Sequence, residues 1–142
     1  METFAPEKGI ALMRTAFEAL QRGDLDAVME RLTANFIINL PGLPEPLHGP
    51  EIWRHGVQSM LEGFPDLRPD IEDIFAAGDK VAVRVRFHGT HQGPFQGIPP
   101  THRTVSFTSI EIYRLEGDKI AEEWVSPDMM SLMQQISGPA HS

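Results

Sequence analysis

The chain has 142 residues, of which 41% are hydrophobic and 23% charged, a composition typical of one ordinary globular domain. Its net charge of −8, without any cluster of Lys or Arg, argues against nucleic acid or an anionic membrane as a partner. With no cysteine, the sequence excludes disulfides, thiolate nucleophiles and cysteine metal ligands. The N-terminal residues do not resemble a signal peptide, and no apolar run reaches membrane-spanning length. We therefore predict a cytoplasmic protein with a single domain over residues 1–142.

The first half of the chain predicts three helices and one short strand. Apolar residues spaced by three and four predict a helix over residues 7–22, and Asp24 is a suitable N-cap for a second one. The apolar run 36–40 predicts a strand. A loop rich in proline follows it and leads to a third helix, which we expect to start at Pro50 and to stop by residue 65.

The second half predicts strands that alternate between apolar and polar residues. We expect strands over residues 70–76, 81–88, 105–114 and 120–126. A final helix follows Asp128, and we expect residues 138–142 to form a disordered tail. Helices followed by a strand meander predict an α+β fold, in which N-terminal helices cover one face of a curved antiparallel sheet.

The strand over 105–114 is unusual because polar and apolar residues occur on both of its faces. Ser109, Glu111 and Tyr113 share one face with two apolar residues, while Ile110 and Ile112 lie on the other. Such a strand indicates a sheet that lines a cavity on one side and has a covering or a subunit contact on the other.

Glu111 and Glu123 are the first candidates for chemistry. If their strands pair across the turn at residues 116–118, these two residues fall opposite each other. Two carboxyl groups close together in an apolar site cannot both ionise cheaply, so one holds a proton and the other remains a base. That arrangement suits removal of a proton next to a carbonyl. The alternative is that both glutamates are solvated or paired with arginines.

Three further polar residues are candidates for ligand contacts, each with a structural alternative. His91 lies in the Gly-rich loop 89–103, where it either meets a ligand at the pocket mouth or fixes the loop. Asn39 either projects its amide into the pocket or forms the turn at Pro41. Asp128 reaches the pocket or only caps the last helix.

The remaining candidates are two possible hydrogen-bond donors and several residues of the pocket wall. Ser109 and Tyr113 are possible hydrogen-bond donors, and Phe17, Trp53 and Phe107 are candidates for core or pocket lining. The spacing of His88 and His91 sends them to opposite faces of a strand, so no metal site is predicted. No nucleotide-binding or phosphate-binding motif occurs, and we expect no cofactor.

The order of elements and several motifs resemble a known family. A helix–helix–strand–helix front half followed by a strand meander resembles the nuclear transport factor two-like (ketosteroid isomerase-like) fold, a cone with an internal pocket. Residues 88–101, His-Gly-Thr-His through Phe-Gln-Gly-Ile-Pro-Pro-Thr, resemble the SnoaL-like polyketide cyclases, and residues 117–120 and 132–136 extend the match. The resemblance implies a homodimer formed through the outer face of the sheet.

The resemblance also implies a reaction, a ring closure by cofactor-free aldol condensation with an Asp on the last strand as the base. In this sequence that position is Val125, which we expect to line the substrate-binding site, and two histidines of the cyclases are replaced by Glu111 and Glu123. We expect these glutamates to act as base and acid on a small apolar or polyketide-like substrate, with Asn39 and His91 polarising its carbonyl. Two alternatives stay open: a water-activating hydrolase of the same fold, and a small-molecule-binding protein without catalysis.

Overall fold

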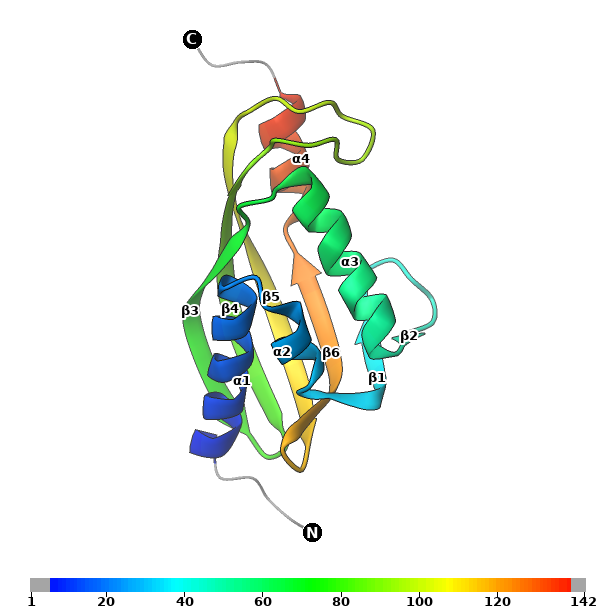
Figure 1. Cartoon of the computed structure of the whole chain (residues 1–142). Helices are drawn as coiled ribbons and strands as arrows, with labels where there is room; N and C mark the ends of the chain where they lie inside the picture. The colour runs from blue at the N-terminus through cyan, green and yellow to red at the C-terminus, as the bar shows by residue number, and fades with distance from the viewer. Residues whose placement is uncertain (1–5, 139–142) are drawn as a thin grey trace.

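A curved six-stranded sheet with helices on its concave face forms the protein, as seen in a computed structural model that describes residues 6–138 (Figure 1). In chain order the elements are α1 (Pro6–Gln21), α2 (Leu25–Met29), β1 (Leu32–Asn39), β2 (Leu47–His48), α3 (Pro50–Gly63), β3 (Arg68–Ala77), β4 (Lys80–Thr90), β5 (Thr104–Glu116), β6 (Lys119–Pro127) and α4 (Met129–Ser137). The predicted α+β class is confirmed. Among the described residues, no helix is both long and apolar enough to cross a membrane. The predicted tail lies outside this range except for Gly138.

The strands follow the order β2-β1-β6-β5-β4-β3. Strands β3 to β6 form the predicted antiparallel meander, but β1 pairs with β6 in parallel, with Ile38 opposite Glu123. The expectation of a purely antiparallel sheet is therefore wrong at this pair. The reason is that β6 would otherwise have a free edge, and β1 brings apolar residues that need burial beside it. The two-residue β2 was not predicted because so short a segment shows no alternation.

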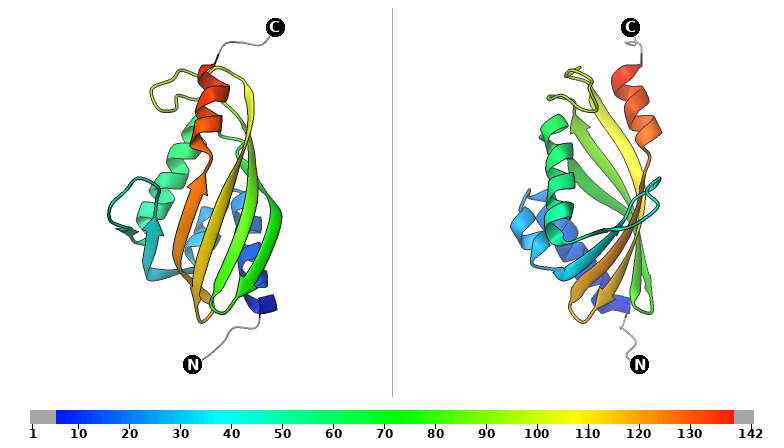
Figure 2. Two further views of the ribbon diagram at one scale, coloured as in Figure 1. Left: turned by 180° about the vertical axis from the view of Figure 1, so that it is seen from behind. Right: turned by 90° about the vertical axis from the view of Figure 1, so that its right-hand side faces the viewer.

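Helices α1, α2 and α3 lie over the concave face of the sheet, and α4 lies at its other end (Figure 2). Apolar side chains of α1 form one cluster with β1, β4 and β5 around Met13, Phe36 and Val85, and Trp53 of α3 packs against this cluster. A second cluster at the other end joins α4, the loop after β4 and the end of α3 around Phe64 and Leu132. From its apolar spacing we expect Leu32 to belong to the second helix, but that helix ends at Met29 and Leu32 begins β1.

The register between β5 and β6 differs from the predicted one by one residue at the turn and by one more at a β-bulge in β6. Leu115 pairs with Ile120, but Arg114 pairs with Glu122, so Ala121 has no partner. Ile120 and Ala121 are consequently buried one after the other, which simple alternation does not allow.

The bulge decides where the two carboxyl groups lie. Val125 is opposite Glu111, and Glu123 is opposite Tyr113, so the glutamates are diagonal neighbours on one face. The predicted pairing of Glu111 with Glu123 is therefore wrong by two residues, although both side chains face the same side of the sheet. Diagonal neighbours are still within reach of long side chains.

The side chain of Gln135 in α4 completes the sheet beside the first half of β5. Strand β6 ends at Pro127, opposite Ser109, and leaves the earlier part of β5 without a neighbour on that side. There the amide of Gln135 accepts a hydrogen bond from the Ser106 backbone N–H (3.1 Å) and donates one to the Ser106 carbonyl (2.7 Å). One side chain thus takes over the hydrogen bonds that a strand would otherwise make.

We predict that Gln135→Leu lowers the free energy of unfolding by about 1–3 kcal/mol, because the backbone groups of Ser106 lose their partners. The matched control is Gln134→Leu on the exposed side of α4, which should change stability by less than about 0.5 kcal/mol. Urea denaturation followed by circular dichroism measures both. Equal stabilities of the two variants would contradict the role assigned to Gln135.

Candidate active site

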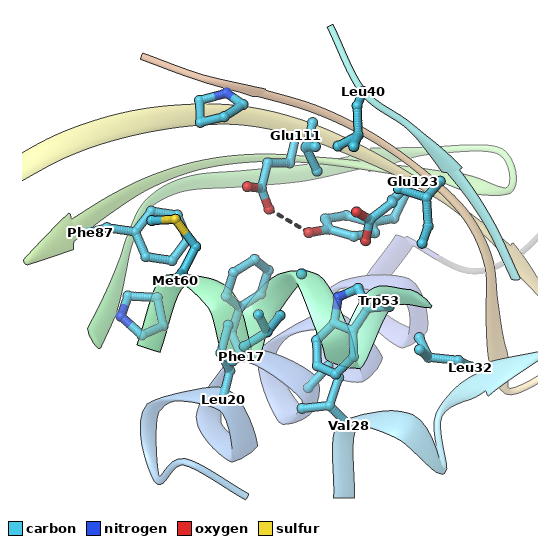
Figure 3. Close-up of a pocket in the computed structure, with 18 of the residues that line it drawn as sticks. Phe17, Leu20, Val28, Leu32, Leu40, Trp53, Met60, Phe87, Glu111 and Glu123 are labelled. Atoms are coloured by element: carbon cyan, nitrogen blue, oxygen red, sulfur yellow. Dashed lines mark hydrogen bonds between the residues drawn. The ribbon is translucent and has the colours of Figure 1, made fainter. Parts of the chain in front are cut away.

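A cavity of about 530 Å³ lies between the concave face of the sheet and the helices (Figure 3). Its walls are mostly apolar and come from α1, α2, α3, β1 and the inner face of β4, β5 and β6. Four of the residues predicted as pocket lining take part: Phe17, Trp53, Phe107 and Val125. Volume and composition are those of sites for small organic ligands.

The polar groups of the cavity are concentrated on β5 and β6. Glu111, Tyr113 and Glu123 line it from the sheet, and each glutamate is only 6% exposed. Within residues 6–138, no Lys or Arg contributes to the lining. The predicted pair of carboxyl groups is therefore brought together in an apolar site, with no basic side chain beside it.

Glu111 is held by two hydroxyl groups from its own strand. The Ser109 hydroxyl donates to Oε2 of Glu111 (2.8 Å), and the Tyr113 hydroxyl donates to Oε1. Alternation along β5 places these three residues next to one another on the inner face. Burial raises the pKa of Glu111, while the hydrogen bonds from Tyr113 and Ser109 oppose that rise because they favour the carboxylate.

Glu123 has a different environment. In the described chain its carboxyl group has no hydrogen-bond partner, and it is directed into the cavity (Figure 3). Burial, with a smaller contribution from the charge of Glu111, raises the pKa of Glu123 to about 8. The hydrogen bonds to Glu111 favour its ionised form, so when the pair holds one proton we assign it to Glu123 and the negative charge to Glu111.

Tyr113 remains a hydrogen-bond donor over the whole physiological range. Burial, together with the nearby charges of Glu111 and Glu123, raises the pKa of the Tyr113 hydroxyl well above its ordinary value. Its ring packs edge-on against Phe17, with centroids 6.2 Å apart, and so fixes the hydroxyl toward Glu111.

The structure does not place His91 at the pocket mouth as predicted. The imidazole is fully buried in the second apolar cluster, stacked on Phe64 with ring centroids 5.4 Å apart. Its Nδ1 accepts a hydrogen bond from the Thr101 backbone N–H (3.2 Å), and its own backbone N–H donates to the Arg103 carbonyl (2.9 Å). His91 closes the loop 91–103 on itself, which is the structural alternative, and Nε2 has no partner among the described residues.

Asn39 and Asp128 also lie outside the cavity lining. Ile38 and Leu40 line the cavity, and alternation turns Asn39 to the outer face, where its amide donates to the Glu122 carboxylate and to the Glu123 carbonyl (3.0 Å each). Asp128 caps α4, accepting a hydrogen bond from the Ser131 backbone N–H (3.0 Å). The expected contacts of both residues with a ligand are not supported by this geometry.

Two polar residues of the lining were missed in the sequence. His55 and Ser59 are four residues apart on α3 and line the cavity from one side of that helix. The signal was their helical spacing relative to the apolar residues Ile52 and Met60, which also take part in the lining. In the part of the chain that the structure describes, no three His, Asp or Glu side chains are grouped to hold a metal ion.

A curved sheet closed by helices around an apolar pocket is the architecture of the nuclear transport factor two-like fold. The sequence model of the family described as SnoaL-like polyketide cyclase matches residues 10–136. The chain therefore belongs to the SnoaL-like polyketide cyclase family. A comparison with curated proteins found no match.

Solved structures agree with this assignment. IdmH from Streptomyces antibioticus, described as a polyketide cyclase, is 30% identical with a TM-score of 0.81, over 89% of this chain and 96% of that one. AclR from Streptomyces galilaeus, described as a hydroxylase, is 25% identical with a TM-score of 0.86, over 97% and 86%. A SnoaL-like protein from Jannaschia sp. CCS1 shares the fold, with a TM-score of 0.86 at 24% identity and 99% coverage of both chains.

The buried proton of Glu123 predicts that stability falls with rising pH. The native state keeps this proton up to pH about 8, whereas the unfolded chain releases it above the ordinary pKa of 4.5. The contribution of Glu123 is therefore fully present below pH 4.5 and is lost as the pH rises to about 8, with a slope of about 1.4 kcal/mol per pH unit. Glu123→Gln should make the decline shallower by this amount, while the raised pKa of Glu111 keeps its own contribution. Urea unfolding at a series of pH values measures it.

The control for this experiment is Glu122→Gln, on the same strand but on the outer face, where Glu122 pairs with Arg114. It should leave the decline between pH 4.5 and 8 in place. A decline that persists unchanged in Glu123→Gln would show that this carboxyl group does not hold the proton.

Proposed function

We propose that the protein is a polyketide cyclase-type enzyme that removes a proton next to a carbonyl group without a cofactor. The observation that supports this most directly is that two neighbouring carboxyl groups differ in their hydrogen bonding. Glu111 accepts two hydrogen bonds, and Glu123 accepts none from the described chain. Such a pair supplies a base and an acid at the same pH.

In the proposed reaction, the Glu111 carboxylate takes a proton from a carbon next to a carbonyl. The C–H bond breaks, and its electron pair forms an enolate whose oxygen accepts a hydrogen bond from the protonated Glu123. The enolate carbon then forms a bond to a second carbonyl carbon of the same molecule as the π bond of that carbonyl breaks. The new alkoxide takes the proton that Glu111 removed, which restores both carboxyl groups to their starting state. These steps make up an intramolecular aldol condensation. The apolar walls strengthen the electrostatic interactions that stabilise the charge in each step.

The apolar walls favour a small apolar or polyketide-like substrate. Trp53 and Phe17 line the cavity from the helices opposite the carboxyl groups, and Phe107 lines it from β5; all three offer flat surfaces for rings. The neighbour IdmH is itself described as a polyketide cyclase, which agrees with this substrate class. In the proposal, Glu123 replaces His91 and Asn39 as the group that polarises the carbonyl.

We predict that wild-type protein accelerates hydrogen–deuterium exchange at the activated carbon of aromatic 1,3-dicarbonyl compounds, followed by NMR in deuterated water. Glu111→Gln should slow this exchange by about 10²–10⁴-fold, because an amide cannot accept the proton. Ligand affinity should change little. Tyr113→Phe should keep activity but shift the pH profile upward, since Glu111 loses a hydrogen bond that favours its ionised form.

The same experiment distinguishes the alternatives. A water-activating hydrolase would instead incorporate solvent oxygen into a product. A binding protein without catalysis would bind these compounds without exchange, and Glu111→Gln with Glu123→Gln together would change nothing measurable. Exchange that continues in Glu111→Gln would remove this residue from the role of base.

We also propose that two copies of the chain associate through the outer face of the sheet. Four residues there lie side by side across β3, β4, β5 and β6 and form an apolar row: Phe75, Ala82, Ile112 and Trp124. Phe75 is 63% exposed, and Ile110 beside the row is 51% exposed. Exposed apolar side chains in a contiguous row are typical of subunit contacts.

For this contact we predict that Ile112→Glu converts a dimer into a monomer, because it puts charge in the centre of the apolar row. Met130→Glu is the control, since Met130 is 74% exposed on α4, away from the row. Sedimentation velocity measures the mass of each variant. A wild-type protein that is monomeric at micromolar concentration would refute the proposal.

A further inference from the structure

The cavity buries two carboxyl groups, and among the described residues no Lys or Arg lines it. Neither Glu111 nor Glu123 forms an ion pair with any Lys, Arg or His of the described chain. A buried carboxylate without a cation is costly, because the interior replaces the solvation that water gave it. The protein reduces this cost by keeping one proton, so a position for a positive charge remains open beside the pair.

Glu123 is the group that a ligand would meet. Its carboxyl group is directed into the cavity with no hydrogen-bond partner in the described chain, and the residue is 94% buried, being 6% exposed (Figure 3). A polar group in this position keeps its hydrogen-bonding capacity for whatever occupies the cavity.

The walls around the pair also suit a cation. Phe17, Trp53 and Tyr113 line the same cavity, and Trp53 lies opposite Glu123 (Figure 3). The faces of aromatic rings attract ammonium groups, most strongly where water is excluded. The apolar side chains of α1 and β1 would then surround the body of the ligand.

We infer that this cavity binds lipophilic ammonium ions, in which a protonated amino group is attached to an apolar or aromatic body, with the nitrogen against Glu123. On binding, Glu123 releases its proton to solvent, and the ammonium N–H donates to the resulting carboxylate. No covalent bond of the ligand changes. The inference concerns binding alone, so it does not depend on the reaction proposed above.

We assign to Glu123, and not to the other titratable groups of the cavity, the proton that is released on binding. Glu111 and Tyr113 face Glu123 from β5, and His55 faces the cavity from an exposed position on α3. The residues that line the cavity from α1, α2 and β1 are all apolar. Glu111 is already held as a carboxylate by two hydroxyl groups, and Tyr113 remains a donor.

Isothermal titration calorimetry with three matched probes tests the inference: naphthylethylammonium, the neutral naphthylethanol and the anion naphthylacetate. At neutral pH the ammonium should bind at least about tenfold more tightly than the alcohol, and the anion most weakly. Titrations in phosphate and in Tris, whose ionisation enthalpies differ, should give a release of close to one proton per ammonium bound. This release should disappear above pH 8, where Glu123 is already ionised.

Glu123→Gln should abolish the proton release and most of the preference for the ammonium, while Glu122→Gln on the outer face should keep both. The proton count in the wild-type protein needs no variant, so a variant that fails to fold does not hide the result. Equal binding of the ammonium and the alcohol, or binding without proton release, would overturn the inference. Neither outcome would affect proton exchange catalysed by Glu111.

Discussion

The hydrogen bonds from two hydroxyl groups to the Glu111 carboxylate are the interaction on which the character of this pocket depends. Without Ser109 and Tyr113, burial would favour the protonated form of both glutamates, and the cavity would hold two neutral acids. With them, one group carries the charge and its neighbour holds the proton. Because all three residues of this network lie on β5, the alternation of side chains along one strand maintains the distinction between base and acid.

The character of the pocket also depends on the bulge at Ala121. It shifts β6 against β5, so that Tyr113 lies between the two carboxyl groups in the cross-strand arrangement, with Val125 opposite Glu111. Without the bulge, the register at the turn, with Leu115 opposite Ile120, would continue and put Trp124 opposite Glu111, so Glu123 would turn to the outer face. A defect of one residue in the ladder therefore sets the spacing of the acidic pair.

Sequence reasoning found the parts of this site that depend on local periodicity. The alternation of residues 105–113 placed Ser109, Glu111 and Tyr113 on one face, and the turn at Gly117 identified the hairpin. It failed where the position of a residue depends on tertiary packing. An extra residue in β6 leaves no mark in an alternating pattern, and the direction of the His91 side chain depends on its packing against Phe64, far away in the sequence. The parallel pairing of β1 likewise depends on a distant partner.

That parallel pairing has a consequence for how the chain acquires its shape. Residues 32–39 complete their hydrogen bonds only with residues 119–127, near the opposite end of the chain. During synthesis, Phe36 and Ile38 therefore lack their neighbours on β6 until residues 119–127 have left the ribosome. Contacts so distant in sequence slow folding and lengthen the time during which an apolar strand is open to association with other chains. Assembly of the cavity is accordingly a late event, and the strand that carries Glu123 is the one that closes it.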